Sequence, residues 1–440
     1  MTPMWEAVRP FLVIGGFFAL VVLGYPISFA LALISLLFML LDPSIALWIM
    51  VQRAIAGLDS FVFMAIPFFV LTGKIMDTGG VSERLVSLAR PMVGHIRGGL
   101  AHVTVVVGMF FAGISGSSTA ESATLSTVFI PAMRRRGYDA AFATSLAAAA
   151  STMGIIIPPS ILMVIYGAVA NVSVGAMFIG GFIPGILIGL SLMAAAYVVA
   201  RRRGYPPETE RWLGAIAILR GLREAALSLL VPVIVVGGIV GGVFTPTEAA
   251  VAAALYALIL TALVYRTVTA AMLMQILVET AQISAVILFC VSTATVFSYL
   301  LAYYKLIALV EAGFRAVTQD PIVLMLLIVL LFIILGTFLD ATPAVLIFVP
   351  ILQPIAEAVG IHPVHMGVVV VMTMALGLLT LPYGLCALTA CAIARIPLAD
   401  IFKMLHLLMI PIMLIIVLCA VFPSLILVLP KLIVPAWVGR

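Results

Sequence analysis

Charged residues are scarce in this chain. Only 9% of its 440 residues are Asp, Glu, Lys or Arg, whereas 65% are hydrophobic. A soluble domain cannot bury so much apolar surface, so the composition excludes the soluble globular class and indicates an integral membrane protein. The net charge of +5 does not indicate a nucleic-acid partner, because the Lys and Arg residues cluster in loops, as the positive-inside rule requires.

Disulfide patterns and catalytic motifs are also lacking. The four cysteines lie in apolar stretches without metal-ligand spacing, which is typical of packing thiols. The sequence has no Walker A motif, no His-Glu-x-x-His and no Gly-x-Ser-x-Gly. We therefore expect neither a cofactor nor an enzyme, and an ion gradient rather than ATP would drive transport. An intramembrane enzyme using Asp340 with a serine or histidine is the remote alternative.

Apolar segments occur in the same order in the two halves of the chain. In the first half they lie at about 10–24, 26–42, 61–77, 100–134, 138–170 and 176–200. In the second half they lie at about 225–244, 247–265, 280–303, 321–357, 364–395 and 405–430. A proline turn joins the first two segments of each half, and a short amphipathic stretch, 47–58 or 267–279, precedes the third. Long segments of this kind predict an all-α fold.

The fourth segment of each half contains a polar break. In the first half the break is Gly113-Ile-Ser-Gly-Ser-Ser-Thr-Ala120, and in the second half it surrounds Asp340. The apolar flanks of Gly113–Ala120 are shorter than the roughly 20 residues of a membrane span. We therefore predict re-entrant helical hairpins at 100–134 and 321–357, whose backbone is tolerated at membrane depth only beside protein or a polar cavity. A loop between two short interfacial helices is the alternative.

The segment after each hairpin is broken in its middle: the first break is Ser151–Ser160, and the second break is Leu376–Gly384. Pro158 lies 45 positions after Gly113, and Pro382 lies 46 positions after Gly336. Helix interiors do not accept a Gly followed by Pro-Pro, as in the first of these segments, without losing backbone hydrogen bonds. We therefore predict that both segments are broken spans that face their hairpins.

Loop charge predicts the orientation of the chain. Arg134–Arg136 and Arg201–Arg203 should both be cytoplasmic, and two crossings separate them. The loop 359–364 has no Lys or Arg and should lie outside, as should both chain ends. Each half then crosses the membrane an odd number of times, so the second half begins on the opposite side and the two halves have opposite topology. We predict an inverted-topology repeat of about ten transmembrane helices with two opposed re-entrant hairpins, as in secondary transporters.

The hairpin tips and the breaks carry the binding chemistry. Half-helices that end at mid-membrane expose carbonyls that attract cations, and those that begin there expose amides that attract anions. Small and hydroxyl-bearing residues at these points offer neutral oxygens that suit a hard monovalent cation. The first predicted site comprises Ser115, Ser117, Ser118, Ser151, Thr152 and Gly154. The second comprises Gly336, Thr337, Asp340, Thr342, Gly377 and Thr380.

Several of these polar residues have alternative roles. Asp340 is ionisable at membrane depth, which indicates function, but it could also cap a helix that begins at Ala341. Any of the serines could bond back to a preceding carbonyl. Glu121 could stabilise a helix N-terminus, face the cavity or titrate. We predict Lys74 and Asp77 at a membrane boundary, snorkelling or paired, rather than in a site.

Five motifs spread over the chain resemble those of one transporter family. They are Ile66-Pro-Phe-Phe-Val70, the first polar break, Gly154-Ile-Ile-Ile-Pro-Pro-Ser160, Phe244-Thr-Pro-Thr-Glu-Ala-Ala250 and Gly360-Ile-His-Pro-Val-His-Met-Gly367. Together they resemble the large membrane subunit (DctM-like) of tripartite ATP-independent periplasmic (TRAP) transporters over almost the whole chain. Two positions depart from the family pattern: Leu381 replaces a usual proline, and Glu121 stands where a small residue is more usual.

The resemblance implies an elevator-type, sodium-coupled transporter of the bacterial inner membrane, with Na⁺ as its only metal. Scaffold parts would lie at 1–60, 176–279 and 398–440, and mobile transport parts at 61–175 and 280–397. The implied partners are a small four-helix membrane subunit, a periplasmic substrate-binding protein, the lipid bilayer and a small carboxylate such as sialic acid or a dicarboxylate. A stand-alone carboxylate carrier without a binding protein is the alternative.

For the implied carboxylate we predict a site between the two hairpin tips. The predicted contacts are Ser118, Pro158, Pro159, Ser160, Asp340 and Pro382. No Arg or Lys lies between residues 97 and 134 or between residues 315 and 395. The amide ends of half-helices and the bound sodium ions would therefore offset the desolvation of the anion.

Overall fold

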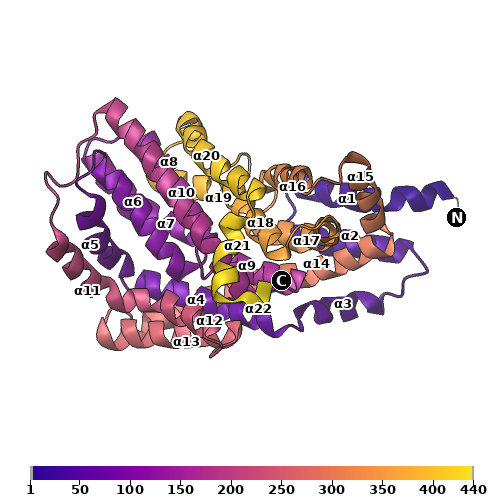
Figure 1. The fold of residues 1–440 in the computed structure, drawn as a ribbon. Helices are drawn as coiled ribbons and strands as arrows, with labels where there is room; N and C mark the ends of the chain where they lie inside the picture. The colour runs from indigo at the N-terminus through magenta and orange to yellow at the C-terminus, as the bar shows by residue number, and fades with distance from the viewer. Residues whose placement is uncertain (1–2, 439–440) are drawn as a thin grey trace.

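A computed structural model describes residues 3–438, and every regular element in that range is a helix (Figure 1). The first half forms α1 (Pro3–Val22), α2 (Ile27–Leu41), α3 (Trp48–Leu58), α4 (Ala65–Thr78), α5 (Val81–Val93), α6 (Gly99–Ser115), α7 (Ser118–Arg135), α8 (Ala140–Ser151), α9 (Ile161–Ala170) and α10 (Val174–Arg203). The second half forms α11 (Ala215–Pro232), α12 (Gly238–Val240), α13 (Pro246–Ile259), α14 (Ala270–Tyr303), α15 (Leu306–Val317), α16 (Pro321–Gly336), α17 (Ala341–Ala358), α18 (Pro363–Gly377), α19 (Leu385–Ala394), α20 (Leu398–Val421), α21 (Ser424–Ile433) and α22 (Pro435–Val438).

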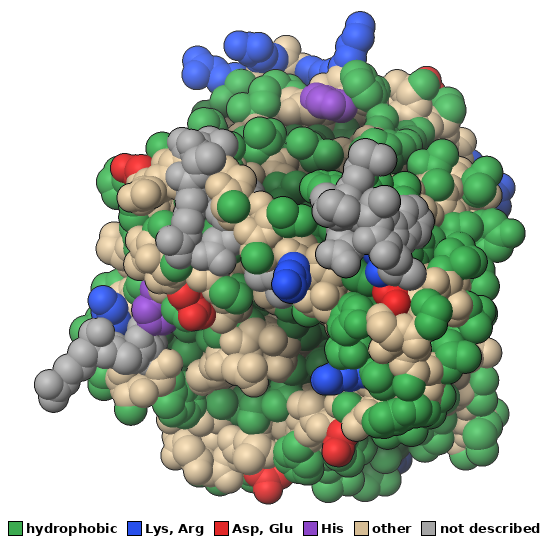
Figure 2. All heavy atoms as spheres, turned by 90° about the vertical axis from the view of Figure 1, so that its right-hand side faces the viewer, with side chains coloured by type: hydrophobic (Ala, Val, Ile, Leu, Met, Phe, Trp, Pro, Cys, Tyr) green, Lys and Arg blue, Asp and Glu red, His purple; other side chains and the backbone are tan. Residues whose placement is uncertain are grey.

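Seven helical segments in the described range are long and apolar enough to cross a membrane, among them α10, α14 and α20. Shorter apolar helices form most of the predicted hairpin arms and broken spans, namely α6, α8, α9, α16, α18 and α19. Figure 2 shows one face of the molecule, where hydrophobic side chains are spread widely and charged ones are few except for Lys and Arg at its upper edge. The chain is therefore a multi-pass, all-helical membrane protein, as predicted.

The helices of the two halves correspond in order. The hairpin α6–α7 matches α16–α17, and the broken span α8–α9 matches α18–α19. One additional helix precedes each hairpin, α5 in the first half and α15 in the second. One long helix follows each broken span, α10 in the first half and α20 in the second. The predicted repeat with two helical hairpins is therefore present.

Two predicted segments have different boundaries in the structure. The amphipathic stretch, from Ala270 onward, and the span 280–303 form one continuous helix, α14, whereas α3 and α4 are separate in the first half. The segment 405–430 is not a single helix, because α20 ends at Val421 and α21 begins only after Pro423. Proline lacks the amide hydrogen that would continue the hydrogen-bond ladder of α20.

Local caps fix where several helices of the hairpins and broken spans begin. Ser160 accepts a hydrogen bond from the amide of Met163 at the start of α9. Asp320 accepts two from the first turn of α16, and the imidazole of His362 accepts one from the first turn of α18. These side chains satisfy amide groups that a helix leaves unpaired at its N-terminus.

Each hairpin packs against the broken span of the opposite half. The second arm of the first hairpin, α7, contacts α8 of its own half and α19 of the other half. The second arm of the second hairpin, α17, contacts α18 of its own half and α9 of the other. Figure 1 shows α9, α17 and α18 together near the middle of the molecule. Hairpins and broken spans of both halves therefore form one interlocked body.

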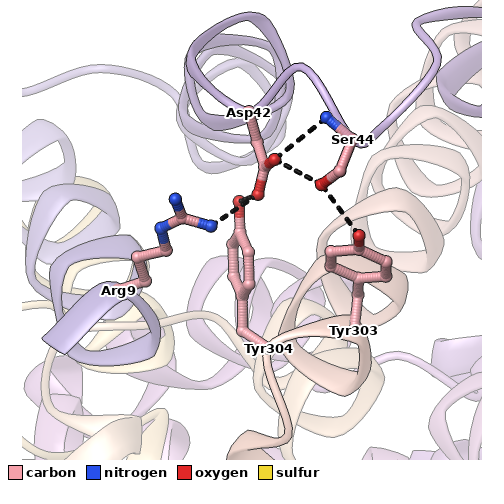
Figure 3. A network of polar contacts seen from close by, with 5 residues as sticks. All are labelled: Arg9, Asp42, Ser44, Tyr303 and Tyr304. Carbon is pink, nitrogen blue, oxygen red and sulfur yellow. Dashed lines mark hydrogen bonds and ion pairs between the residues drawn. The ribbon is translucent and has the colours of Figure 1, made fainter. Parts of the chain in front are cut away.

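A buried ion pair joins α1, the end of α2 and the end of α14 (Figure 3). Arg9 Nη1 lies 2.7 Å from Asp42 Oδ2, and the hydroxyl of Tyr304 donates to the same carboxylate oxygen at 3.2 Å. Burial alone would raise the pKa of Asp42, but the hydrogen bonds from Ser44 and the charge of Arg9 outweigh it, so this pKa lies below its usual value. The network fixes α14 against the first two helices.

The two arginine runs lie at the same end of the structure. Arg203 Nη1 is 2.7 Å from Asp139 Oδ2, just after α7, and Arg136 Nη2 is 3.3 Å from Glu208 Oε1, just after α10. The packing is therefore consistent with the prediction that both loops lie on the same side of the membrane. Beside them, Tyr138 stacks on Tyr205, and burial raises the pKa of Tyr138 to about 12.

Candidate functional site

A cavity of about 480 Å³ lies where both hairpin tips approach α4 and α14. The tip of the first hairpin supplies a continuous stretch of its wall, Ser115–Ala120. The tip of the second supplies Asp340, Ala341 and Thr342, while α14 closes the opposite side with Gln282, Ile283, Val286 and Ile287. The structure thus brings Ser115, Ser117 and Ser118 of the first predicted site and Asp340 and Thr342 of the second to one space, while the other predicted site residues do not line this cavity.

The first hairpin tip is bonded directly to the first break. The amide of Ile161 donates to the carbonyl of Gly116 at 3.3 Å, and Ser118 Oγ donates to the carbonyl of Thr152 at 3.3 Å. Gly116 has a φ of +64°, and a Cβ at this position would lie 2.8 Å from the carbonyl oxygen of Pro159. Only glycine combines that backbone conformation with so close an approach.

The second hairpin tip is bonded to the second break in the same way. The amide of Tyr383 donates to the carbonyl of Thr337 at 3.2 Å. Gly336 and Gly377 meet backbone to backbone, since a Cβ on Gly336 would lie 2.8 Å from the Cα of Gly377. Some of the residues predicted to meet therefore do so: Ser118 contacts Thr152 in the first half, and Gly336 contacts Gly377 in the second. What they bind stays a prediction.

Several of the predicted hydroxyls bond back to their own helices. Ser151 and Thr152 donate to carbonyls three residues earlier, at 2.8 and 2.6 Å, and Thr337 and Thr380 do the same at 2.6 and 2.8 Å. The alternative role, a hydrogen bond back to a preceding carbonyl, is therefore present for the hydroxyl hydrogens of these four residues. Their oxygen lone pairs are not consumed by donating, so these hydroxyls still offer acceptors to a cation.

Asp340 stands at the first residue before α17 and is half-buried. It has the backbone conformation of a helix cap, but its side chain makes no capping hydrogen bond to α17. Together with Thr342, it also lines a second cavity of about 720 Å³, which extends to the turn Gly24–Pro26 and to Pro382. Asp340 therefore lies between the two cavities, where a helix N-terminus and a carboxylate face the same space.

The predicted substrate contacts are not all in reach of a solute. Ser118 and Asp340 line the first cavity, and Pro382 lines the second. Pro158, Pro159 and Ser160 are buried, and none of the three lines either cavity. The hydroxyl of Ser160 donates to the carbonyl of Ile155 and caps α9, so its contacts are structural.

Lys74 and Asp77 line the first cavity, so they do not lie apart from the candidate site as predicted. Lys74 Nζ is 2.8 Å from Glu279 Oε2 of α14, so the predicted pairing of this lysine is present. Thr124 on α7 donates to Asp77 Oδ1 at 2.7 Å. The sequence signal that could have placed these two residues in the cavity is their spacing. Val70, Gly73, Lys74 and Asp77 lie on one face of α4, because residues three, four and seven apart share a helix face.

Glu121 is fully buried in the first turn of α7. Neither of its carboxylate oxygens has a hydrogen-bond partner among the residues that the structure describes. A Cβ at Gly154 would collide with Oε2, and one at Gly108 would lie 3.1 Å from Oε1. Two glycines thus make room for a carboxylate beside the first predicted cation site.

Comparison with known proteins identifies the family. Residues 14–425 match the family model described as tripartite ATP-independent periplasmic transporter, DctM component. The sialic acid TRAP transporter large permease protein SiaM of Vibrio cholerae is 40% identical over 95% of this chain and 97% of its own length. The C4-dicarboxylate TRAP transporter large permease protein DctM of the same species is 35% identical over 87% of this chain and 89% of its own.

A solved structure shows the same fold at much lower sequence similarity. The crystal structure of the Alcanivorax borkumensis YdaH transporter, described as having an unusual topology, aligns with a TM-score of 0.60. The alignment covers 88% of this chain and 90% of that one at 16% identity, which supports the fold alone. With the family match and the long similarity to named permease subunits, this chain belongs to the DctM component family of TRAP transporters.

Proposed function

We propose that this chain is the large permease subunit of a sodium-coupled, binding-protein-dependent transporter that imports a small carboxylate across the bacterial inner membrane by an elevator mechanism. The observation that supports this most is the cavity shared by both hairpin tips. Each tip is bonded to a break of its own half, so each junction places carbonyls, amides and hydroxyls at one point. Such discontinuous helices form ion and substrate sites in secondary transporters.

Sodium would bind at the two junctions. The first would use Ser115, Ser117, Ser118, Ser151, Thr152 and Gly154, and the second Gly336, Thr337, Asp340, Thr342, Gly377 and Thr380. Oxygen ligands of this kind suit a hard cation, and the carbonyl ends of α6 and α16 carry partial negative charge. A bound ion would also hold each hairpin tip on its break.

The carboxylate would occupy the first cavity. Sialic acid and C4-dicarboxylates, the solutes named for two relatives, both carry carboxylate groups. The N-terminus of α7 at Ser118 and that of α17 after Asp340 face this cavity. Lys74 of α4 adds a full positive charge, which the hairpin tips and the breaks themselves lack. Because Glu279 already pairs with Lys74, the substrate would share that ammonium group.

The packing supports a mobile body larger than the parts 61–175 and 280–397. Helix α10 packs against α6, α9 and α18, and α20 packs against α8, α16 and α18. We therefore place α10 and α20 with the hairpins rather than with the scaffold parts 176–279 and 398–440. Helix α4 packs against α13 as well as α6, so it forms the edge of the mobile body that faces the scaffold.

Reconstituted transport tests the proposed function. Proteoliposomes would hold this chain with its small membrane subunit, and a binding protein and an inward sodium gradient would be added across a panel of organic acids. We expect accumulation of one acid class only when sodium and binding protein are both present. Equal uptake without binding protein would favour the stand-alone carrier, and uptake independent of sodium would overturn the coupling.

Cysteine labelling tests the orientation. A probe cysteine near Arg440 should react with an impermeant reagent from outside, and one at Tyr138 should not. The reverse pattern would invert the proposed topology.

A further inference from the structure

Glu121 is the one carboxylate of the first hairpin, and it lies in a space built for it. Its side chain points between α6 and the short 3-10 helix Thr152–Ile155, where Gly108 and Gly154 leave room for the two oxygens. Ser118, one turn earlier on α7, donates to the carbonyl of Thr152 across the same gap. The carboxylate therefore sits at the junction of the first hairpin tip and the first break.

The described surroundings of Glu121 contain no cation that pairs with it. On the elements packed against α7, the titratable groups are Cys386 and Cys391 of α19 and His102 of α6, which bonds to the carbonyl of Arg97. Two other acids face the hairpin tips: Asp77 is held by Thr124, about one turn after Glu121 on α7, and Asp340 lies at the other tip. None of the described Lys, Arg or His side chains forms an ion pair with Glu121.

A buried carboxylate without partners is unfavourable. Moving an ionised carboxylate out of water is unfavourable even after the protein relaxes, unless a countercharge and hydrogen bonds compensate. The partial positive charge at the N-terminus of α7 offsets only part of this cost. The two orphaned oxygens thus fit a cation that would complete the site, and oxygen ligands suit a hard ion such as Na⁺.

We propose that Glu121 is a charged ligand of the cation at the first junction, so that this site binds Na⁺ through a carboxylate as well as through neutral oxygens. The inference rests on the proposed function, since it adds a ligand to one of its two sodium sites. It also gives each junction one acid: Glu121 buried at the first and Asp340 facing the cavities at the second.

Binding of radioactive sodium to the purified complex with the small membrane subunit tests this directly. Glu121→Gln keeps the shape of the side chain and removes its charge, so the affinity of one sodium ion should fall at least tenfold while the other is retained. Glu121→Asp keeps the charge and should restore part of the affinity. The surface variant Glu224→Gln should bind sodium like the unchanged protein, because Glu224 is exposed.

A substitution at Gly108 tests the space around the carboxylate while leaving Glu121 itself unchanged. A Cβ on Gly108 would lie 3.1 Å from Oε1, so Gly108→Ala should displace the carboxylate slightly and weaken the same sodium ion several-fold. Thermal unfolding of each purified variant would show whether it is folded. Unchanged sodium affinity in folded Glu121→Gln, or equal loss in Glu121→Asp and Glu121→Gln, would overturn the proposal and leave a neutral, structural carboxyl.

The outcome separates this inference from the proposed function. If the unchanged protein takes up its substrate with sodium but Glu121→Gln binds sodium normally, only the role of Glu121 is wrong. If the unchanged protein binds no sodium and needs none for uptake, the sodium coupling and the role of Glu121 both fail.

Discussion

The two hairpin junctions share a backbone arrangement but differ in how they hold their acid. In each, an amide just after the break donates to a carbonyl of the tip, Ile161 to Gly116 and Tyr383 to Thr337. The first junction is buried, and its acid, Glu121, is completely enclosed. The second is more open, with Phe338 47% exposed and Asp340 lining both cavities.

This difference shows which part of the repeat is general and which is specific. The backbone contacts recur because they follow from a helical hairpin that meets a broken helix, whatever the side chains are. The position of the acid is particular to each half, so one carboxylate is sealed inside while the other is in reach of a solute. We expect the second junction to sense the substrate and the first to respond chiefly to the ion.

Removing the acid of the open junction should have the largest effect. Asp340→Ala should abolish sodium-driven uptake, because it deletes the charged oxygens at the proposed second site, while the protein still inserts and assembles. The matched control is Asp320→Ala at the start of the other arm, α16, where the acid only caps a helix. That control should lower the free energy of unfolding by about 1 kcal/mol and leave uptake intact.

Full sodium-dependent uptake by Asp340→Ala would contradict the second site. A loss of uptake in both variants would instead indicate that the second hairpin is too fragile for either change, and Asp340→Asn, which keeps the side-chain shape, would then decide.

Adding one methyl group at the junctions should have the next largest effect. A Cβ on Gly377 would lie 2.9 Å from the Cα of Gly336, and one on Gly116 would lie 2.8 Å from the carbonyl oxygen of Pro159. Because backbone atoms cannot move aside as a side chain can, Gly377→Ala and Gly116→Ala should each lower the free energy of unfolding by about 1–3 kcal/mol. Thermal unfolding of the purified protein measures this.

Gly113→Ala is the control for these variants. Its Cβ would lie no closer than 3.5 Å to its neighbours, which is ordinary contact, so it should unfold like the unchanged protein. If Gly377→Ala were as stable as Gly113→Ala while Gly116→Ala were not, the open junction would be looser than its close backbone contact indicates.

Loss of the cavity lysine should have the smallest effect. Lys74→Gln removes the positive charge near the first hairpin tip, and we expect the KM for a carboxylate to rise about tenfold, which corresponds to about 1.4 kcal/mol. Lys431 is exposed and lines neither cavity, so Lys431→Gln should leave KM unchanged. If Lys74→Gln transported with an unaltered KM, the ammonium group would serve only to bind Glu279.

The features that the sequence alone predicted are those with local signals. Clusters of Gly, Pro and hydroxyl residues in an apolar segment made the hairpins, both breaks and the order of the two halves visible, whereas single prolines such as Pro131 and Pro184 lie inside continuous helices. The continuous helix α14 was not visible, because nothing local distinguishes an amphipathic stretch that ends at a span from one that runs into it. Pro423 was a local signal that the predicted last segment overlooked.

Site features that depend on tertiary packing were not predictable in this way. Lys74 has the pattern of a boundary residue, and only the approach of α14 and the first hairpin tip places it in the cavity. Pro158 and Pro159 mark the break correctly, yet the tip covers them, so the position of a break does not determine which of its residues face a solute. Likewise, no local signal predicts the packing of α10 and α20 against the hairpin and broken-span helices, on which we base their proposed place in the mobile body.

Calorimetry of carboxylate binding to the complex of the two membrane subunits, with and without sodium, tests the central claim most directly. The claim is that ion and substrate sites meet at the two tips, so their binding free energies must be coupled, and coupling is reciprocal. We predict that sodium strengthens carboxylate binding at least tenfold and that the carboxylate strengthens sodium binding by the same factor. Carboxylate binding of equal strength in the presence and absence of sodium would contradict it.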